Sequence, residues 1–297
     1  MTDTISNGLD RTTYLGSSDA APAIGVSPWK TALDVYFEKL GEPTNLDNLP
    51  IRYGTFNQPF VAKEWELQTG NTVHSCEKHF VHPDHPFIQC HVDYLSDLED
   101  QQAIIEVKTS GRHWDDLPLY YQAQVQQQLA CSGLQLAYVP VLFAGRDFKV
   151  FEVQAIEEVQ ERMMEKMCAL WVHIQERTPP HPVTPDDVKK LWPYDTGESV
   201  EASQEVHQYL AELVKTKREV KKLQDQQAVL EGSVKIAMKD ATVLVNEDGT
   251  PLASWKSTKP SNRFNSKKFV SENPELAESY TDEVNGYRRF IIKENNL

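Results

Sequence analysis

The sequence predicts an α/β protein in which helices flank a mixed sheet, followed by a helical and small β C-terminal region. Between residues 31 and 177, helical patterns alternate with short apolar runs in the order helix, strands, helix, strands. Beyond a Pro-rich stretch the chain turns helix-forming and charged, and a hairpin pattern follows. We therefore expect a main domain over residues 1–180, a connector over 181–200 and an accessory region over 201–297.

Composition describes an ordinary globular protein, with 297 residues of which 40% are hydrophobic and 25% charged. No apolar run approaches the roughly 20 residues of a membrane span, and the first residues lack the apolar segment of a signal peptide. We therefore expect a cytoplasmic protein with reduced cysteines. The net charge of −14 lies within residues 1–200, because residues 201–297 contain 15 basic and 15 acidic residues. Composition thus neither supports nor excludes a nucleic-acid partner.

The N-terminal motif predicts a short helix. Ser17 or Ser18 with Asp19 forms a typical N-cap signal, and Gly25 is placed to end the helix. The free N–H groups at the start of such a helix could also bind a phosphate. Helix capping by itself is a sufficient explanation for serine and aspartate at these positions.

Two further helices are predicted over residues 31–41 and 51–70, each closed by a glycine. The second helix carries apolar side chains that we expect to pack on the sheet: Phe60, Val61, Trp65 and Leu67.

Two short apolar runs on either side of an acidic turn, residues 96–102, predict a β-hairpin. Side chains two residues apart in a strand point to the same face. Glu106 and Lys108 are therefore expected to project together, while Ile105 and Val107 enter the core.

Asp93 precedes this hairpin and can reach the face of Glu106 and Lys108. Two carboxylates suit a hard divalent ion such as Mg²⁺, and a neighbouring lysine can position a water or offset phosphate charge. This arrangement predicts metal-assisted phosphodiester hydrolysis. The pattern is loose, however, and a solvated Glu/Lys pair that stabilises the sheet by a few tenths of a kcal/mol is the plainer alternative.

The chain continues with a predicted helix over 119–133, strands over 134–143 and 148–153, and a long helix over 156–177. One face of the first of these helices is polar and could turn amide groups toward an active site; it carries Tyr120, Tyr121, Gln124 and Gln128.

The C-terminal region opens with a charged helix over residues 201–239 whose apolar stripe is typical of a packing or oligomerisation helix. A predicted hairpin turns at residues 246–249. A segment with interleaved aromatic residues then carries five cations that suit a DNA backbone or, equally, a solvated loop: Lys256, Lys259, Arg263, Lys267 and Lys268.

Residues 76–91 contain four histidines and two cysteines, which are residue types that can bind zinc. The segment is broken by prolines and its spacing matches no standard ligand pattern, so ordinary loop histidines explain it better.

Taken in order, these motifs resemble the lambda-exonuclease/YqaJ-like viral recombinase family of the PD-(D/E)xK nucleases. The matching residues span 11–154: Arg11 with Leu-Gly-Ser-Ser-Asp and Val-Ser-Pro-Trp-Lys, Gly54-Thr to Thr69-Gly70, Asp93, Glu106-Val-Lys, and Gln124-Val-Gln. Several ordered motifs are far more specific than any one of them.

The resemblance implies Asp93, Glu106 and the Val107 carbonyl as Mg²⁺ ligands, with Mn²⁺ able to substitute, Lys108 as the catalytic lysine and Gln124 near the attacking water. It assigns Arg11 and Ser18 to the 5′-phosphate, with DNA contacts from the neighbouring Ser17, Trp29 and Lys30. The implied activity is 5′-to-3′ digestion of linear duplex DNA, leaving 3′ overhangs for a phage-type single-strand-annealing protein in a bacterial host. Family members often form trimeric rings, so a homo-oligomer is expected.

Two positions depart from the family pattern. Val92 replaces the motif-opening proline, and Gln58 stands where the family places a metal-binding glutamate. An amide oxygen can coordinate Mg²⁺ but brings no charge, which predicts a weak second metal site. The alternatives are an endonuclease or single-strand nuclease of the same superfamily, and a catalytically weakened DNA-binding accessory protein.

Overall fold

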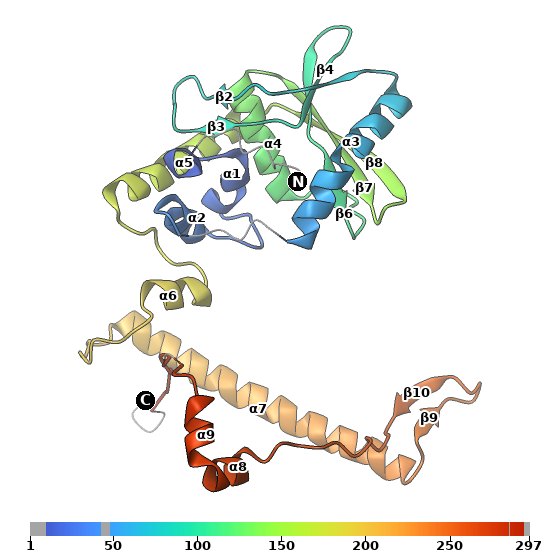
Figure 1. Cartoon of the computed structure of the whole chain (residues 1–297), viewed down its shortest axis with the longest axis vertical. Helices are drawn as coiled ribbons and strands as arrows, with labels where there is room; N and C mark the ends of the chain where they lie inside the picture. The colour runs from blue at the N-terminus through green and yellow to red at the C-terminus, as the bar shows by residue number, and fades with distance from the viewer. Residues whose placement is uncertain (1–9, 43–47, 285, 294–297) are drawn as a thin grey trace. The chain divides into compact units, whose positions relative to one another are not determined.

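The computed structural model describes residues 10–42, 48–284 and 286–293, and divides into two compact units, Met1–Trp192 and Pro193–Leu297 (Figure 1). The helices of the first unit are η1 (Arg11–Thr13, a 3₁₀-helix), α1 (Ser17–Ala23), α2 (Ala32–Lys39), α3 (Leu49–Thr69), α4 (Leu119–Ser132), α5 (Glu157–Glu176) and α6 (Pro185–Leu191). Its strands are β1 (Val73–Ser75), β2 (Phe80–Val81), β3 (Gln89–Cys90), β4 (Tyr94–Asp97), β5 (Gln102–Ile105), β6 (Lys108–Ser110), β7 (Leu136–Phe143) and β8 (Asp147–Gln154).

The main sheet is mixed, as predicted. β4 pairs antiparallel with β1 and β5, so the predicted hairpin is present. Its turn is shorter than the predicted residues 96–102, because Asp97 pairs with Gln102 and leaves residues 98–101 as the turn. β5 and β6 both pair parallel with β7, which pairs antiparallel with β8 on its other side. Because β5 and β6 follow one another along the same edge of β7, they act as one strand that is interrupted at residues 106–107.

Helices cover both faces of this sheet. The larger core lies beneath α1, α2, α4 and α5, and contains Ile104, Val139 and Leu129. The smaller core lies beneath α3, where Val61 and Ala62 pack with Val107 and Leu142. Figure 1 shows α3 beside β6 and β7, so this helix stands next to the interruption in the β5–β6 strand.

The predicted packing of α3 is correct for Val61 and Trp65 and wrong for Phe60 and Leu67. Val61 and Trp65 are buried, whereas Phe60 and Leu67 are 57% and 71% exposed. At about 100° per residue, Phe60 and Leu67 lie within about 20° of one another and about 130° around the helix from the middle of the buried pair, so they face away from the core.

Two local predictions also need correction. The N-cap of α1 is Gly16 rather than Ser17 or Ser18, which are the first helical residues, and the Asp19 carboxylate accepts the Gly16 N–H at 2.8 Å. The predicted irregular connector contains α6, whose capping box joins Thr184 to Asp187 with Pro185 in the first turn. Thr31 Oγ1 donates to the Asp187 carboxylate at 2.8 Å, which fastens α6 to the start of α2.

The second unit contains α7 (Gln204–Met238), β9 (Val243–Val245), β10 (Pro251–Ser254), α8 (Ser266–Glu272) and α9 (Pro274–Ser279). β9 and β10 form the predicted antiparallel hairpin. In the described part of the chain, no helix combines the length and apolar character that crossing a bilayer requires.

Candidate active site

The interruption of the β5–β6 strand brings the predicted acidic residues together. The Glu106 N–H still donates to the Tyr138 carbonyl of β7 at 2.9 Å, but the next N–H, of Val107, donates to Asp93 Oδ2 at 2.9 Å. At this position the Asp93 side chain accepts the hydrogen bond that the carbonyl of a neighbouring strand would otherwise accept. The backbone fixes its carboxylate beside the Glu106–Lys108 segment, as the sequence pattern predicted.

The Glu106 carboxylate is buried and accepts three hydrogen bonds. Oε1 accepts from Lys108 Nζ and from Gln124 Nε2, both at 2.6 Å, and Oε2 accepts from Gln128 Nε2 at 2.8 Å. Only 3% of Glu106 is exposed. Helix α4 therefore holds this carboxylate in one orientation through two amides one turn apart.

The sequence pattern placed Gln128 on the face of α4 whose amides could turn toward an active site, but it did not predict that Gln128 binds Glu106. Gln127 and Gln128 are both completely buried. Gln127 Nε2 lies 3.3 Å from the Leu15 carbonyl and 3.2 Å from that of Gln89, so it joins the start of α1 to β3. The available signal was a run of amide side chains inside an otherwise apolar helix, because buried polar groups require partners.

Burial and the charge of Glu106 raise the pKa of Asp93 to about 7, against the lowering effects of Lys108, the Val107 N–H and the Gln58 amide. Burial by itself lowers the pKa of Lys108, but the carboxylates of Glu106 and Asp93 outweigh it, and the net shift is upward. Lys108 is therefore an ammonium ion at neutral pH. Two crowded carboxylates with one lysine leave negative charge that a bound cation would compensate.

A cavity of about 420 Å³ lies over these groups. Its walls include Asp93, Glu106 and Lys108 on one side, Gln58 of α3 on another, and Tyr121 of α4. The oxygen donors fit Mg²⁺, which takes one or two carboxylates and completes its shell with water and phosphate. Asp93, Glu106 and the Val107 carbonyl would hold such an ion, with the Gln58 amide as a neutral further donor.

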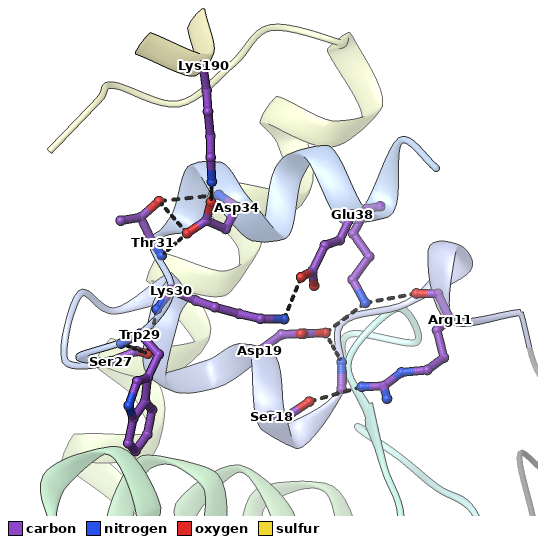
Figure 2. Close-up of polar contacts among 12 residues, drawn as sticks. Arg11, Ser18, Asp19, Ser27, Trp29, Lys30, Thr31, Asp34, Glu38 and Lys190 are labelled. Atoms are coloured by element: carbon purple, nitrogen blue, oxygen red, sulfur yellow. Dashed lines mark hydrogen bonds and ion pairs between the residues drawn. The ribbon is translucent and has the colours of Figure 1, made fainter. Parts of the chain in front are cut away.

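The residues predicted to bind a 5′-phosphate also lie together. The Arg11 guanidinium donates to Ser18 Oγ at 3.0 Å, across the seven-residue gap expected from the motif (Figure 2). A second cavity, of about 230 Å³, is lined by Ser17, Ser18, Trp29 and Lys30.

This second cavity adjoins the acidic one. Tyr121 lines both, and Gln124, which donates to Glu106, lines the second. Trp29 packs edge-on against Tyr120, with ring centroids 4.6 Å apart. Figure 2 shows Lys30 Nζ paired with Glu38, at 2.5 Å. The predicted end-binding group and the predicted metal ligands therefore share one wall, which α4 supplies.

A buried ion pair that sequence reasoning missed supports Arg11. Lys39 Nζ lies 2.7 Å from Asp19 Oδ2, and both side chains are only 4% exposed. The same Nζ donates to the Arg11 carbonyl at 2.8 Å, and Asp19 accepts the Gly16 N–H. Lys39 thus joins the segment that carries Arg11 to the helix that carries Ser18.

The remaining predicted groups lie elsewhere. The ring of His79 stacks on His91 with centroids 4.5 Å apart, and burial lowers the pKa of both. Within residues 10–42, 48–284 and 286–293, no three His, Cys, Asp or Glu side chains converge as metal ligands. The five basic residues of the C-terminal segment are all exposed and belong to the second unit.

Comparison with known proteins finds similarity to one family over the part of the chain that carries this site. Residues 9–135 match the model of the YqaJ-like viral recombinase domain. The chain is 27% identical over 302 residues to the uncharacterized protein YqaJ of Bacillus subtilis (strain 168), with 96% of this chain and 93% of that protein covered.

Two solved structures are similar at lower identity. The alkaline exonuclease LHK-Exo of Laribacter hongkongensis gives a TM-score of 0.47 at 14% identity, covering 57% of this chain and 91% of that one. A phage-related exonuclease from Haemophilus somnus 129PT gives 0.45 at 13% identity, covering 55% and 94%. The family whose model matches residues 9–135 is the one that the ordered motifs resembled.

Proposed function

We propose that this chain is a Mg²⁺-dependent exonuclease that digests linear double-stranded DNA from a 5′-phosphorylated end. The observation that carries the proposal is the shared wall between two cavities, one with Asp93, Glu106 and Lys108 and the other with Ser18 and Lys30. A terminal phosphate held in the second cavity would place a nearby phosphodiester over the first. The family of the domain and the oxygen donors support the same reading.

The residues divide the chemistry among them. A divalent ion at Asp93 and Glu106 would supply an activated water and neutralise charge on the scissile phosphate. The Lys108 ammonium stands where it can stabilise the charge that develops on that phosphate. Gln124 and Gln128 keep the Glu106 carboxylate oriented, and Tyr121 separates the reacting phosphate from the terminal one.

The product of this reaction would be a duplex with a 3′ single-stranded overhang, the substrate of a phage-type single-strand-annealing protein, which we propose as the functional partner. A ring-shaped homo-oligomer would explain how a chain of net charge −14 stays on DNA, because enclosure supplements electrostatic attraction.

The test uses a linear duplex in which one strand carries a 5′-phosphate and the other a 5′-hydroxyl, each with its own 3′ dye. In Mg²⁺ we expect progressive shortening of the 5′-phosphorylated strand with its 3′ dye retained. Arg11→Ala should reduce the preference for that strand about tenfold or more, because it removes a charge-assisted phosphate contact. Shortening of both strands at equal rates would contradict the end-binding assignment, and cutting of closed circular duplex would favour an endonuclease.

A further inference from the structure

Within the described residues of the second unit, helix α7 has little to stabilise it. It runs for 35 residues, about 52 Å at 1.5 Å per residue. Among the described residues, its buried side chains are Val214 and Met238. Helices in proteins gain most of their stability from packing an apolar face against other elements. A helix of this length with so little burial requires a partner surface.

Seven of the exposed apolar side chains of α7 fall on one spacing that alternates three and four residues, whereas Val229 and Ile236 lie outside it. In a heptad abcdefg, position a is occupied by Val206, Leu213, Val220, Gln227 and Val234. Position d is occupied by Tyr209, Thr216, Leu223, Leu230 and Ala237. The large apolar members of this seam are between 37% and 68% exposed. Five consecutive heptads of this kind are typical of a coiled coil.

The residue types at the seam favour two strands. Valine occupies three of the five a positions, and leucine occupies two of the five d positions. β-branched residues at a with leucine at d favour a parallel two-stranded coil. Gln227 is the single amide at position a, and one polar residue there fixes the register of the two helices.

Charges beside the seam favour the parallel orientation. In a parallel coil, position g of one helix faces position e five residues later on the other. Glu212 then faces Lys217 of the second helix, and two-fold symmetry makes this pair twice. Glu219 faces Gln224 and Gln226 faces Glu231, so no like charges meet. An antiparallel coil with the same seam would place Glu212 opposite Ser233 and lose both ion pairs.

The C-terminal half of the seam lines an apolar groove of about 570 Å³. Leu223, Leu230 and Val234 form one wall, and Ala253 and Trp255, at the end of the β9–β10 hairpin, form the other. We propose that α7 is an interaction surface for a second copy of this chain, with which it forms a parallel, in-register, two-stranded coiled coil. This contact joins chains in pairs and is separate from the contacts of the proposed ring.

The test compares two double variants of the full chain by sedimentation equilibrium. Leu223→Lys with Leu230→Lys places charges in the seam. Val229→Lys with Ile236→Lys places them at position c, where both side chains are also strongly exposed, at 68% and 76%. We expect the seam variant to have half the mass of the wild type and the position-c variant to keep the wild-type mass. A wild type at the single-chain mass of 33.9 kDa, or equal masses for all three proteins, would overturn the proposal.

Cross-linking tests orientation without destabilising charges. Tyr209→Cys places a thiol at position d near the N-terminal end of α7, and Ala211→Cys places one at the outward position f. Under oxidising conditions we expect a covalent dimer on non-reducing gels from Tyr209→Cys, at least tenfold more than from Ala211→Cys. In an antiparallel coil Tyr209 would face Val234 rather than its own copy, so equal and low yields from the two variants would refute the parallel coil.

Discussion

Replacing Asp93 by asparagine should stabilise the metal-free protein, although it removes a proposed metal ligand. In the folded chain the pKa of Asp93 is raised from 3.8 to about 7, because the carboxylate is buried beside Glu106. A carboxyl group whose pKa is raised in the folded state lowers the free energy of unfolding when it is ionised. Its unfavourable contribution is absent below pH 3.8 and complete once the pH rises through 7.

The magnitude follows from the difference of about three pH units, at about 1.36 kcal/mol each. At pH 8 the ionised Asp93 lowers the free energy of unfolding by on the order of 4 kcal/mol, and at pH 5 by less than about 2 kcal/mol. The asparagine oxygen can still accept the Val107 N–H. For a unit of this size the pH 8 effect corresponds to a rise in Tm on the order of 10 °C.

The assay is thermal unfolding of wild type and Asp93→Asn in EDTA at pH 5 and pH 8. We expect the variant to be more stable, and by more at pH 8. Saturating Mg²⁺ should reverse the order at pH 8, since the ion stabilises only the chain that binds it. A variant that is less stable than wild type at pH 8, or one whose Tm gain is the same at both pH values, would refute the electrostatic reasoning.

Three further results are expected. The Mg²⁺ concentration for half-maximal activity should rise about tenfold per pH unit below pH 7, because a proton on Asp93 competes with the ion; a value constant from pH 6 to 8 would contradict this. Gln58→Glu should lower that concentration several-fold by adding a charged ligand, and wild-type saturation at low Mg²⁺ would argue against a weak second site. Lys39→Met should reduce the preference for 5′-phosphorylated ends about tenfold, because it removes the hydrogen bond that Lys39 donates to the Arg11 carbonyl. Lys39→Arg should restore the preference, and Lys63→Met, at an exposed site, should leave it unchanged.

Much of the fold was predictable because local patterns and long-range contacts agree. The β4–β5 hairpin follows from two short runs around an acidic turn, although the turn is shorter than predicted, and pairing of the two strands brings Asp93 near Glu106. The long helices α4, α5 and α7 follow from their periodicity and glycine or polar ends.

Contacts between elements that are distant in the sequence were harder to predict. The Lys39–Asp19 pair joins α2 to α1. Its burial could not be predicted from residue type, because lysine and aspartate are usually exposed. Phe60 and Leu67 were misassigned because apolar identity predicts burial only where an element of the same chain covers that side of the helix. Helix α6 was missed although its capping box was readable, because the surrounding prolines favour an extended connector.

The interrupted strand shows the same limit at the active site. Alternation predicted that Glu106 and Lys108 project together, and they do, at 2.6 Å. It did not predict the break at residues 106–107 or the two amides of α4 that hold Glu106. Those contacts depend on the position of α4 over the sheet, which is a property of the packed core.

The most direct measurement is nucleotide release from 5′-phosphorylated linear duplex DNA in Mg²⁺ by wild type, Lys108→Met and Lys63→Met. The two methionine variants each remove one ammonium group, but only Lys108 touches Glu106. We predict that wild type and Lys63→Met release nucleotides at similar rates and that Lys108→Met is slower by about 100-fold or more, with DNA binding retained. Release by Lys108→Met at the wild-type rate, or no release by any of the three proteins, would contradict the assignment of this site as a nuclease.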